Sequence, residues 1–198
     1  MTDEELLAHY LPPAMEQYFT KKLPDVSPSD LRCRIAEFLK GVTLLHLSPG
    51  DILFSKEIDA IWHYWILETA EYAILCQRLT GGEFIHHTSN DYPRATNAQD
   101  EEDPKHATRR LIVFFCIYVS QFGPIDEDRL VYWPPLAMLL KLCGWSLAHA
   151  NDLLLQRARD FDAALAAVRP ILPLKYSIAG SMAATRDGTD QGGKSFPT

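Results

Sequence analysis

KEIDAIWHYWILETAEYAILCQRL, residues 56–79, is the stretch that most strongly indicates the fold. Its large apolar and aromatic residues recur at steps of three and four, as on one face of an α-helix, and not in the alternation typical of a strand. Ser55 can cap the start of this predicted helix, and Gly81 and Gly82 can end it because glycine accepts left-handed backbone angles. The predicted buried face comprises Ile58, Trp62, Trp65, Thr69, Tyr72, Cys76 and Leu79.

Helical patterns also flank this stretch on both sides. A capping box at Thr2 and Glu5 opens a helical region that is interrupted at Pro12 and Pro13 and continues to about residue 22. Further helices are predicted over residues 28–45, 104–122, 135–142 and 147–168, and a polar loop over residues 88–103. We therefore predict an all-α, single-domain bundle of about six helices over residues 1–177, with a flexible, disordered or irregular tail over residues 178–198.

Composition excludes several classes of partner. A length of 198 residues suits one domain, and 47% hydrophobic residues are ordinary for a globular protein. The net charge of −7 disfavours nucleic acid, because binding to phosphates needs clustered Lys and Arg. The longest apolar run, residues 111–119, is too short for a bilayer span, so no membrane partner is expected.

The cysteines and the N-terminal segment predict a cytoplasmic protein. Cys33, Cys76, Cys116 and Cys143 are widely and unequally spaced in apolar stretches, which indicates buried thiols and not a disulfide framework. The start MTDEELL lacks the basic and apolar segments of a secretory signal. The remaining partner classes are a small molecule or another protein.

Asp59 and His63 are the candidate site on the predicted helix. They lie four residues apart, so both side chains project from the border of the apolar face. A carboxylate and an imidazole at this spacing can share one metal ion, or they can form a hydrogen bond on the helix surface. The adjacent His86 and His87 offer further nitrogen ligands.

A joint site requires the chain to reverse after the double glycine. A straight helix would place His63 ~25 Å from its end near Thr80, whereas the segment from Thr80 to His86 spans at most about 20 Å. If the segment runs back along the helix, one histidine of the pair can meet Asp59 and His63. Two histidines and one carboxylate form a set that suits non-haem iron. If the segment does not run back along the helix, His86 and His87 are partly exposed side chains and no joint site exists.

The same residues carry a resemblance to a known family. The string from Asp59 to Tyr72, followed by Cys76, Gly82, Phe84 and the histidine pair, resembles the signature of the glycine-rich domain-containing protein-like family, formerly a domain of unknown function. Phe122–Gly123 and Trp133–Pro134 extend the resemblance over most of residues 52–135. The characteristic positions of the family fall on Asp59, Trp62, His63, Leu67, Thr69, Tyr72, Cys76 and His86 or His87. The family usually has a second histidine where this chain has Trp65, and the resemblance implies no established reaction.

Two functional hypotheses follow. In the first, Asp59, His63 and one of His86 and His87 bind a divalent metal ion, iron or zinc, with coordination positions left open. In the second, the chain is a non-catalytic interaction or structural domain whose tryptophan and histidine residues lock its helices together. Neither hypothesis specifies a reaction.

Overall fold

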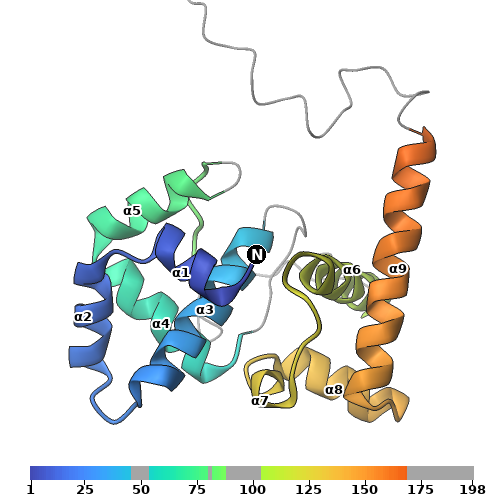
Figure 1. Ribbon diagram of the computed structural model, residues 1–198, viewed down its shortest axis with the longest axis horizontal. Helices are drawn as coiled ribbons and strands as arrows, with labels where there is room; N and C mark the ends of the chain where they lie inside the picture. The colour runs from blue at the N-terminus through green and yellow to red at the C-terminus, as the bar shows by residue number, and fades with distance from the viewer. Residues whose placement is uncertain (46–53, 80–81, 88–103, 169–198) are drawn as a thin grey trace, which may run out of the picture. The chain divides into compact units, whose positions relative to one another are not determined.

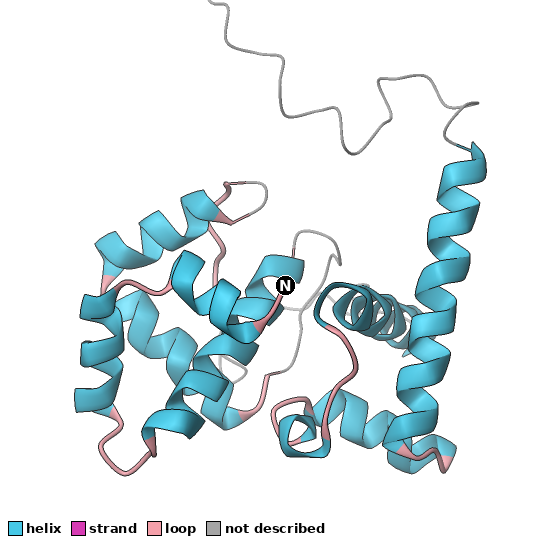
Figure 2. Ribbon diagram, viewed as in Figure 1, coloured by secondary structure: helices cyan, strands magenta, loops and turns pink. Residues whose placement is uncertain are grey.

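The fold is that of a computed structural model, which describes residues 1–45, 54–79, 82–87 and 104–168 (Figure 1). These ranges contain α-helices and connecting turns and no strand (Figure 2), so the predicted all-α class is confirmed. The helices are α1 Asp3–Tyr10, α2 Pro13–Lys22, α3 Pro28–Leu44, α4 Lys56–Leu67, α5 Thr69–Arg78, α6 Pro104–Phe122, α7 Glu127–Leu130, α8 Pro134–Cys143 and α9 Leu147–Val168.

The chain divides into two compact units. Met1–Arg159 is the first and contains α1 to α8 and the first part of α9. Asp160–Thr198 is the second, of which the structure describes only the end of α9. The predicted loop over residues 88–103, the predicted tail over residues 178–198 and the boundary between residues 177 and 178 lie outside the described residues.

Local capping signals locate the helix starts correctly. Thr2 forms a complete capping box with Glu5. Ser27 accepts a hydrogen bond from the Asp30 amide at the start of α3. These side chains satisfy amide groups that have no partner inside the helix, which is why the helices begin at these residues.

The prediction of one helix over residues 56–79 was wrong, because the chain breaks between α4 and α5. Glu68 leaves the helical region, with φ −92° and ψ 71°. The Trp62 indole nitrogen donates to the Tyr72 hydroxyl at 2.9 Å, whereas a straight helix would separate these residues by ~15 Å along its axis. Tertiary packing therefore places the break, since no proline or glycine lies near Glu68.

The predicted count of about six helices was too low, since nine are present in the described ranges. The break at Glu68 adds one helix, and Pro12 separates α1 from α2. The single turn α7 is too short to show a helical period in the sequence. Thr69 was predicted to be buried but is exposed, because it begins α5 at the break.

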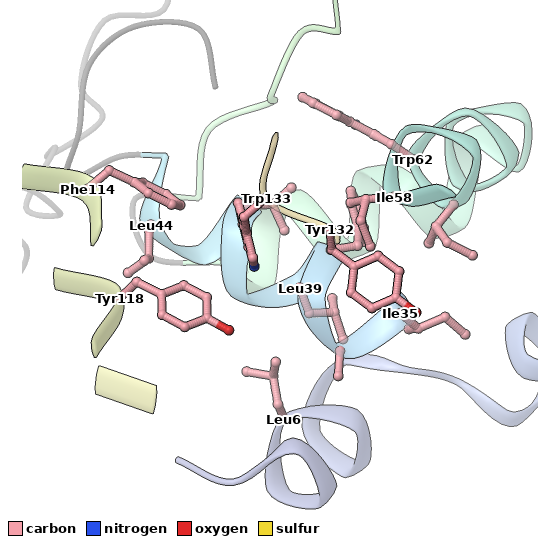
Figure 3. Packing of buried hydrophobic residues seen from close by; sticks show 14 of the residues in the cluster. Leu6, Ile35, Leu39, Leu44, Ile58, Trp62, Phe114, Tyr118, Tyr132 and Trp133 are labelled. Atoms are coloured by element: carbon pink, nitrogen blue, oxygen red, sulfur yellow. The ribbon is translucent and has the colours of Figure 1, made fainter. Parts of the chain in front are cut away.

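α3 is the helix around which the first unit packs. It contacts α1, α2, α4 and α6. Figure 3 shows the side chains that meet on it, from α1 (Leu6), α4 (Ile58 and Trp62), α6 (Phe114 and Tyr118) and the start of α8 (Trp133). Trp65 and Trp133 are completely buried, and so they are among the largest contributors to the core.

A buried carboxylate lies inside this packing. Glu37 in α3 is completely buried. Its Oε1 atom accepts hydrogen bonds from Lys40 at 2.8 Å and Arg129 at 2.9 Å, and its Oε2 atom accepts from Tyr118 and Trp133, both at 2.7 Å. We call Glu37 and these four donors the Glu37 cluster. It connects α3 to α6, to α7 and to the start of α8.

Gly41 in α3 provides a stability prediction. A Cβ atom there would overlap the Phe54 ring and lie 3.2 Å from Cη2 of Trp133. The Phe54 ring already packs against Trp62 and Trp133, so it has little room to move. We expect Gly41→Ala to lower the free energy of unfolding by ~1–3 kcal/mol in urea denaturation, in spite of the better helix propensity of alanine. A variant as stable as the parent would contradict the close packing at this position.

The cysteines and the membrane prediction have separate outcomes. Cys76 and Cys116 are buried and Cys33 is partly buried, but Cys143 is exposed at the end of α8, which corrects the prediction for that residue. It is the last residue of the helix, next to the C-cap Gly144, whose left-handed φ of +66° ends the helix there. None of the helices in the described ranges combines the length and the apolar character that a membrane crossing requires.

Candidate metal centre

α4 presents two of the predicted ligands. The Ser55 hydroxyl accepts a hydrogen bond from the Ile58 amide at 3.4 Å and so begins the helix. The buried face of α4 includes Ile58 and Trp62, and it fixes the rotation of the helix about its axis. Asp59 and His63 lie one turn apart beside this face, with 44% and 51% of their side chains exposed.

The chain reverses after α5 and brings His87 to this pair. Gly82 has the predicted left-handed angle, with φ +63°, but it follows the end of the helix, because α5 already ends at Arg78 with Leu79 in an extended conformation. The His87 Nε2 atom lies 2.9 Å from Oδ1 of Asp59, and the His87 ring centroid lies 4.4 Å from that of His63. The chain reversal on which the joint site depended is therefore present.

The structure separates the two histidines of the pair. His87 has only 12% of its side chain exposed and belongs to the cluster. His86 is exposed and packs against the ring of Phe84, with centroids 5.0 Å apart. Neighbouring residues of an extended segment point to opposite sides, which explains why only one of the two joins Asp59 and His63.

Asp59, His63 and His87 are the group with metal-ligand chemistry among the described residues. One ligand atom from each lies within 4.8 Å of the others. Metal–ligand bonds of about 2.1 Å in tetrahedral or octahedral geometry place neighbouring ligand atoms ~3.0–3.4 Å apart. The distance of 3.2 Å between Asp59 Oδ2 and His63 Nδ1 falls in this range, and the distance of 2.9 Å between Asp59 Oδ1 and His87 Nε2 lies just below it. A small approach of the two rings would complete the set.

The backbone also orients the His63 ring. Its Nδ1 atom lies 2.8 Å from the carbonyl oxygen of Asp59, one turn earlier in α4. When Nδ1 carries the proton it donates to this carbonyl, whereas as a metal ligand beside Oδ2 the same atom must be unprotonated. The hydrogen-bond partner of the His63 ring is thus the Asp59 backbone carbonyl, while the Asp59 carboxylate lies 3.2 Å from the same ring nitrogen and also contacts His87, which makes a three-residue cluster.

Two aromatic residues support the cluster from the core side. The Trp62 and His87 rings form an edge-to-face contact at 84°, with centroids 4.5 Å apart. The Tyr72 hydroxyl accepts from the Trp62 indole and donates to the Ile85 carbonyl at 2.6 Å. Burial raises the pKa of Tyr72 far above its ordinary range, so this hydroxyl keeps its proton and remains a donor.

The sequence did not reveal this supporting role. Trp62 and Tyr72 were predicted only as buried residues of one straight helix, and both are buried. Their hydrogen bond depends on the break at Glu68, and the bond to Ile85 depends on the course of the returning segment. The signal that was present is chemical, since a buried indole and a buried phenol each require a hydrogen-bond partner.

Comparison with known proteins assigns no relative to the chain. No protein family, curated protein or solved structure matches it. The resemblance to the glycine-rich domain-containing protein-like family therefore stays a prediction, and the functional argument depends on the geometry of the site.

Proposed function

We propose that this chain is a metal-binding helical protein in which Asp59, His63 and His87 bind one divalent ion. The observation that carries the proposal is the placement of both His63 and His87 against one carboxylate, each within hydrogen-bond distance of a different oxygen. A helix-surface pair alone would not recruit a histidine from 28 residues further along the chain.

The donor set favours iron or zinc. Two imidazoles and one carboxylate are the ligands of mononuclear ferrous sites, and they also bind zinc when coordination positions are kept open. Structural zinc sites use four protein ligands, whereas three leave room for water or a substrate. The exposure of Asp59 and His63 gives solvent access to such positions. Membership of the family that the sequence resembles is part of the same proposal, because its characteristic positions include Asp59, His63 and one of His86 and His87.

Metal analysis tests the proposal directly. The full chain is purified without a metal-affinity tag, and bound metal is measured by elemental mass spectrometry before and after reconstitution with Fe(II) or Zn(II). We expect one ion per chain. In His87→Ala and Asp59→Asn the affinity should fall by more than the ~10–100-fold that follows loss of an outer-shell partner. Circular dichroism checks that each variant remains helical.

The neighbouring histidine provides a matched control. His86→Ala removes an imidazole from the same segment, but one that is exposed and lies outside the cluster. It should bind metal like the parent. Equal loss in His86→Ala and His87→Ala would contradict the assignment of His87. A folded parent that binds neither ion would overturn the proposal and favour a non-catalytic interaction domain.

A further inference from the structure

The Tyr72 hydroxyl is buried, and it both accepts and donates a hydrogen bond. The residue is 2% exposed. Its oxygen accepts a hydrogen bond from the Trp62 indole at 2.9 Å, and its proton goes to the Ile85 carbonyl at 2.6 Å. A side chain that only filled the core would be served equally well by phenylalanine, so the hydroxyl requires an explanation of its own.

The accepting carbonyl lies two residues before His87. Within the described part of the chain, residues 83–87 make two hydrogen bonds, which are this one and the contact of His87 with Asp59. The hydroxyl is thus the main-chain anchor of the returning segment on the side of α5. Trp62 links Tyr72 to His87 by a second route, because the indole that donates to Tyr72 also packs against the His87 ring.

We propose that Tyr72 is a positioning residue of the metal centre, which holds His87 over Asp59 through the Ile85 carbonyl. The expected effect on metal affinity rests on the proposed function, whereas the positioning of His87 by the Tyr72 hydroxyl does not depend on it. Without the hydroxyl, the segment would have to be ordered when the ion binds, and the entropy of ordering would weaken binding. Tyr72 would touch neither the ion nor a ligand, and would act only through the backbone.

Tyr72→Phe tests the role of the hydroxyl, since it keeps the buried ring and removes one oxygen. Co(II) titration of the metal-free full chain, followed by absorbance and by competition with a chelator, gives the affinity. We expect binding ~10–100-fold weaker than in the parent, the range for outer-shell partners of metal ligands. Tyr118→Phe is the matched control, because it removes an equally buried hydroxyl that donates to Glu37 and contacts no site residue. Its affinity should equal that of the parent.

A second measurement does not depend on metal. In the metal-free parent, proton NMR should show a nuclear Overhauser effect between the His87 ring and the Trp62 indole, whose centroids lie 4.5 Å apart. We expect Tyr72→Phe to lose this signal and Tyr118→Phe to retain it. If Tyr72→Phe does not fold, Trp62→Phe removes the donor to the hydroxyl together with the indole contact on His87, and a loss of affinity relative to Tyr118→Phe is expected.

The outcomes separate the two proposals. A parent that binds no Co(II) overturns the metal centre, while loss of the His87–Trp62 signal in Tyr72→Phe still supports the positioning role. A parent that binds Co(II) and a Tyr72→Phe variant that binds equally well, with the signal retained, overturns the positioning role alone. Equal weakening in Tyr72→Phe and Tyr118→Phe would also overturn it, because the effect would then come from general stability.

Discussion

Replacement of Glu37 by alanine is expected to lower the free energy of unfolding by ~3–5 kcal/mol, the range observed when one partner of a buried ion pair is removed. The carboxylate is completely buried and accepts four hydrogen bonds. Without it, Lys40 and Arg129 would keep their charges close together, and Asp3 would be the remaining carboxylate that contacts them in the described part of the chain. The hydroxyl of Tyr118 would also lose its acceptor.

The charges explain why the cluster is stable as it stands. Glu37 and Asp3 balance Lys40 and Arg129, which contact both carboxylates at 2.7–2.9 Å. Burial acts to raise the pKa of Asp3, but the two cations hold it below its ordinary value. Burial and the neighbouring carboxylate raise the pKa of Tyr118 far above its usual range, so its phenol remains a donor. A complete set of partners offsets the cost of burying charge, and an incomplete one does not.

Urea denaturation followed by circular dichroism measures the effect. Glu37→Gln keeps the volume of the side chain and part of the hydrogen bonding. Its free energy of unfolding should therefore lie between those of the parent and of Glu37→Ala. Glu127→Ala, an exposed glutamate in α7, is the control and should change stability by no more than about 0.5 kcal/mol. A loss below about 1 kcal/mol in Glu37→Ala would show that the cluster does not hold the later helices to α3.

Helix starts could be predicted from the sequence because their causes are local. Thr2, Ser27 and Ser55 each bond to an amide within three residues, and this interaction needs no information from the rest of the chain. The left-handed turn at Gly144 is local in the same sense. The break at Glu68 could not be predicted in this way. It accompanies the hydrogen bond between Trp62, which precedes Glu68, and Tyr72, which follows it.

The position of α3 was predictable in principle but was missed. Residues 35–45, IAEFLKGVTLL, are apolar on nearly every face, which is typical of a helix surrounded by others. Only Glu37 and Lys40 are charged there, three residues apart, and in such a segment they must be buried together. The partners of this helix, Tyr118 and Trp133, lie far away in the sequence and could not have been named.

The candidate site divides in the same way. The spacing of Asp59 and His63 places them together on any helix, so that pair followed from the sequence. The choice of His87 over His86 depends on the direction in which the returning segment faces, which the Tyr72–Ile85 bond and the Trp62–His87 contact determine. Those interactions exist only in the folded chain, and the sequence therefore left both histidines open.

Trp62→Ala is expected to cost ~3–5 kcal/mol of unfolding free energy, the usual range for removal of a large buried aromatic side chain. The residue is 7% exposed, and its ring packs against Phe38 and Phe54 with centroids 6.0 and 5.6 Å apart. The variant would leave a cavity between α3 and α4 and would remove the donor to Tyr72. Urea denaturation measures the loss, and Trp145→Ala, which removes an exposed indole, should cost less than about 1 kcal/mol.

The same variant should also affect the metal centre. Trp62 contacts the His87 ring and holds the Tyr72 hydroxyl, so its removal should weaken Co(II) binding as well as folding. A double-mutant cycle with Tyr72→Phe separates the two effects, because residues that act through one hydrogen-bonded chain give non-additive losses. We expect the double variant to bind little worse than Trp62→Ala alone. Additive losses in affinity would mean that Trp62 and Tyr72 reach His87 by independent routes, and a stability loss below about 1 kcal/mol would contradict the buried position of the indole.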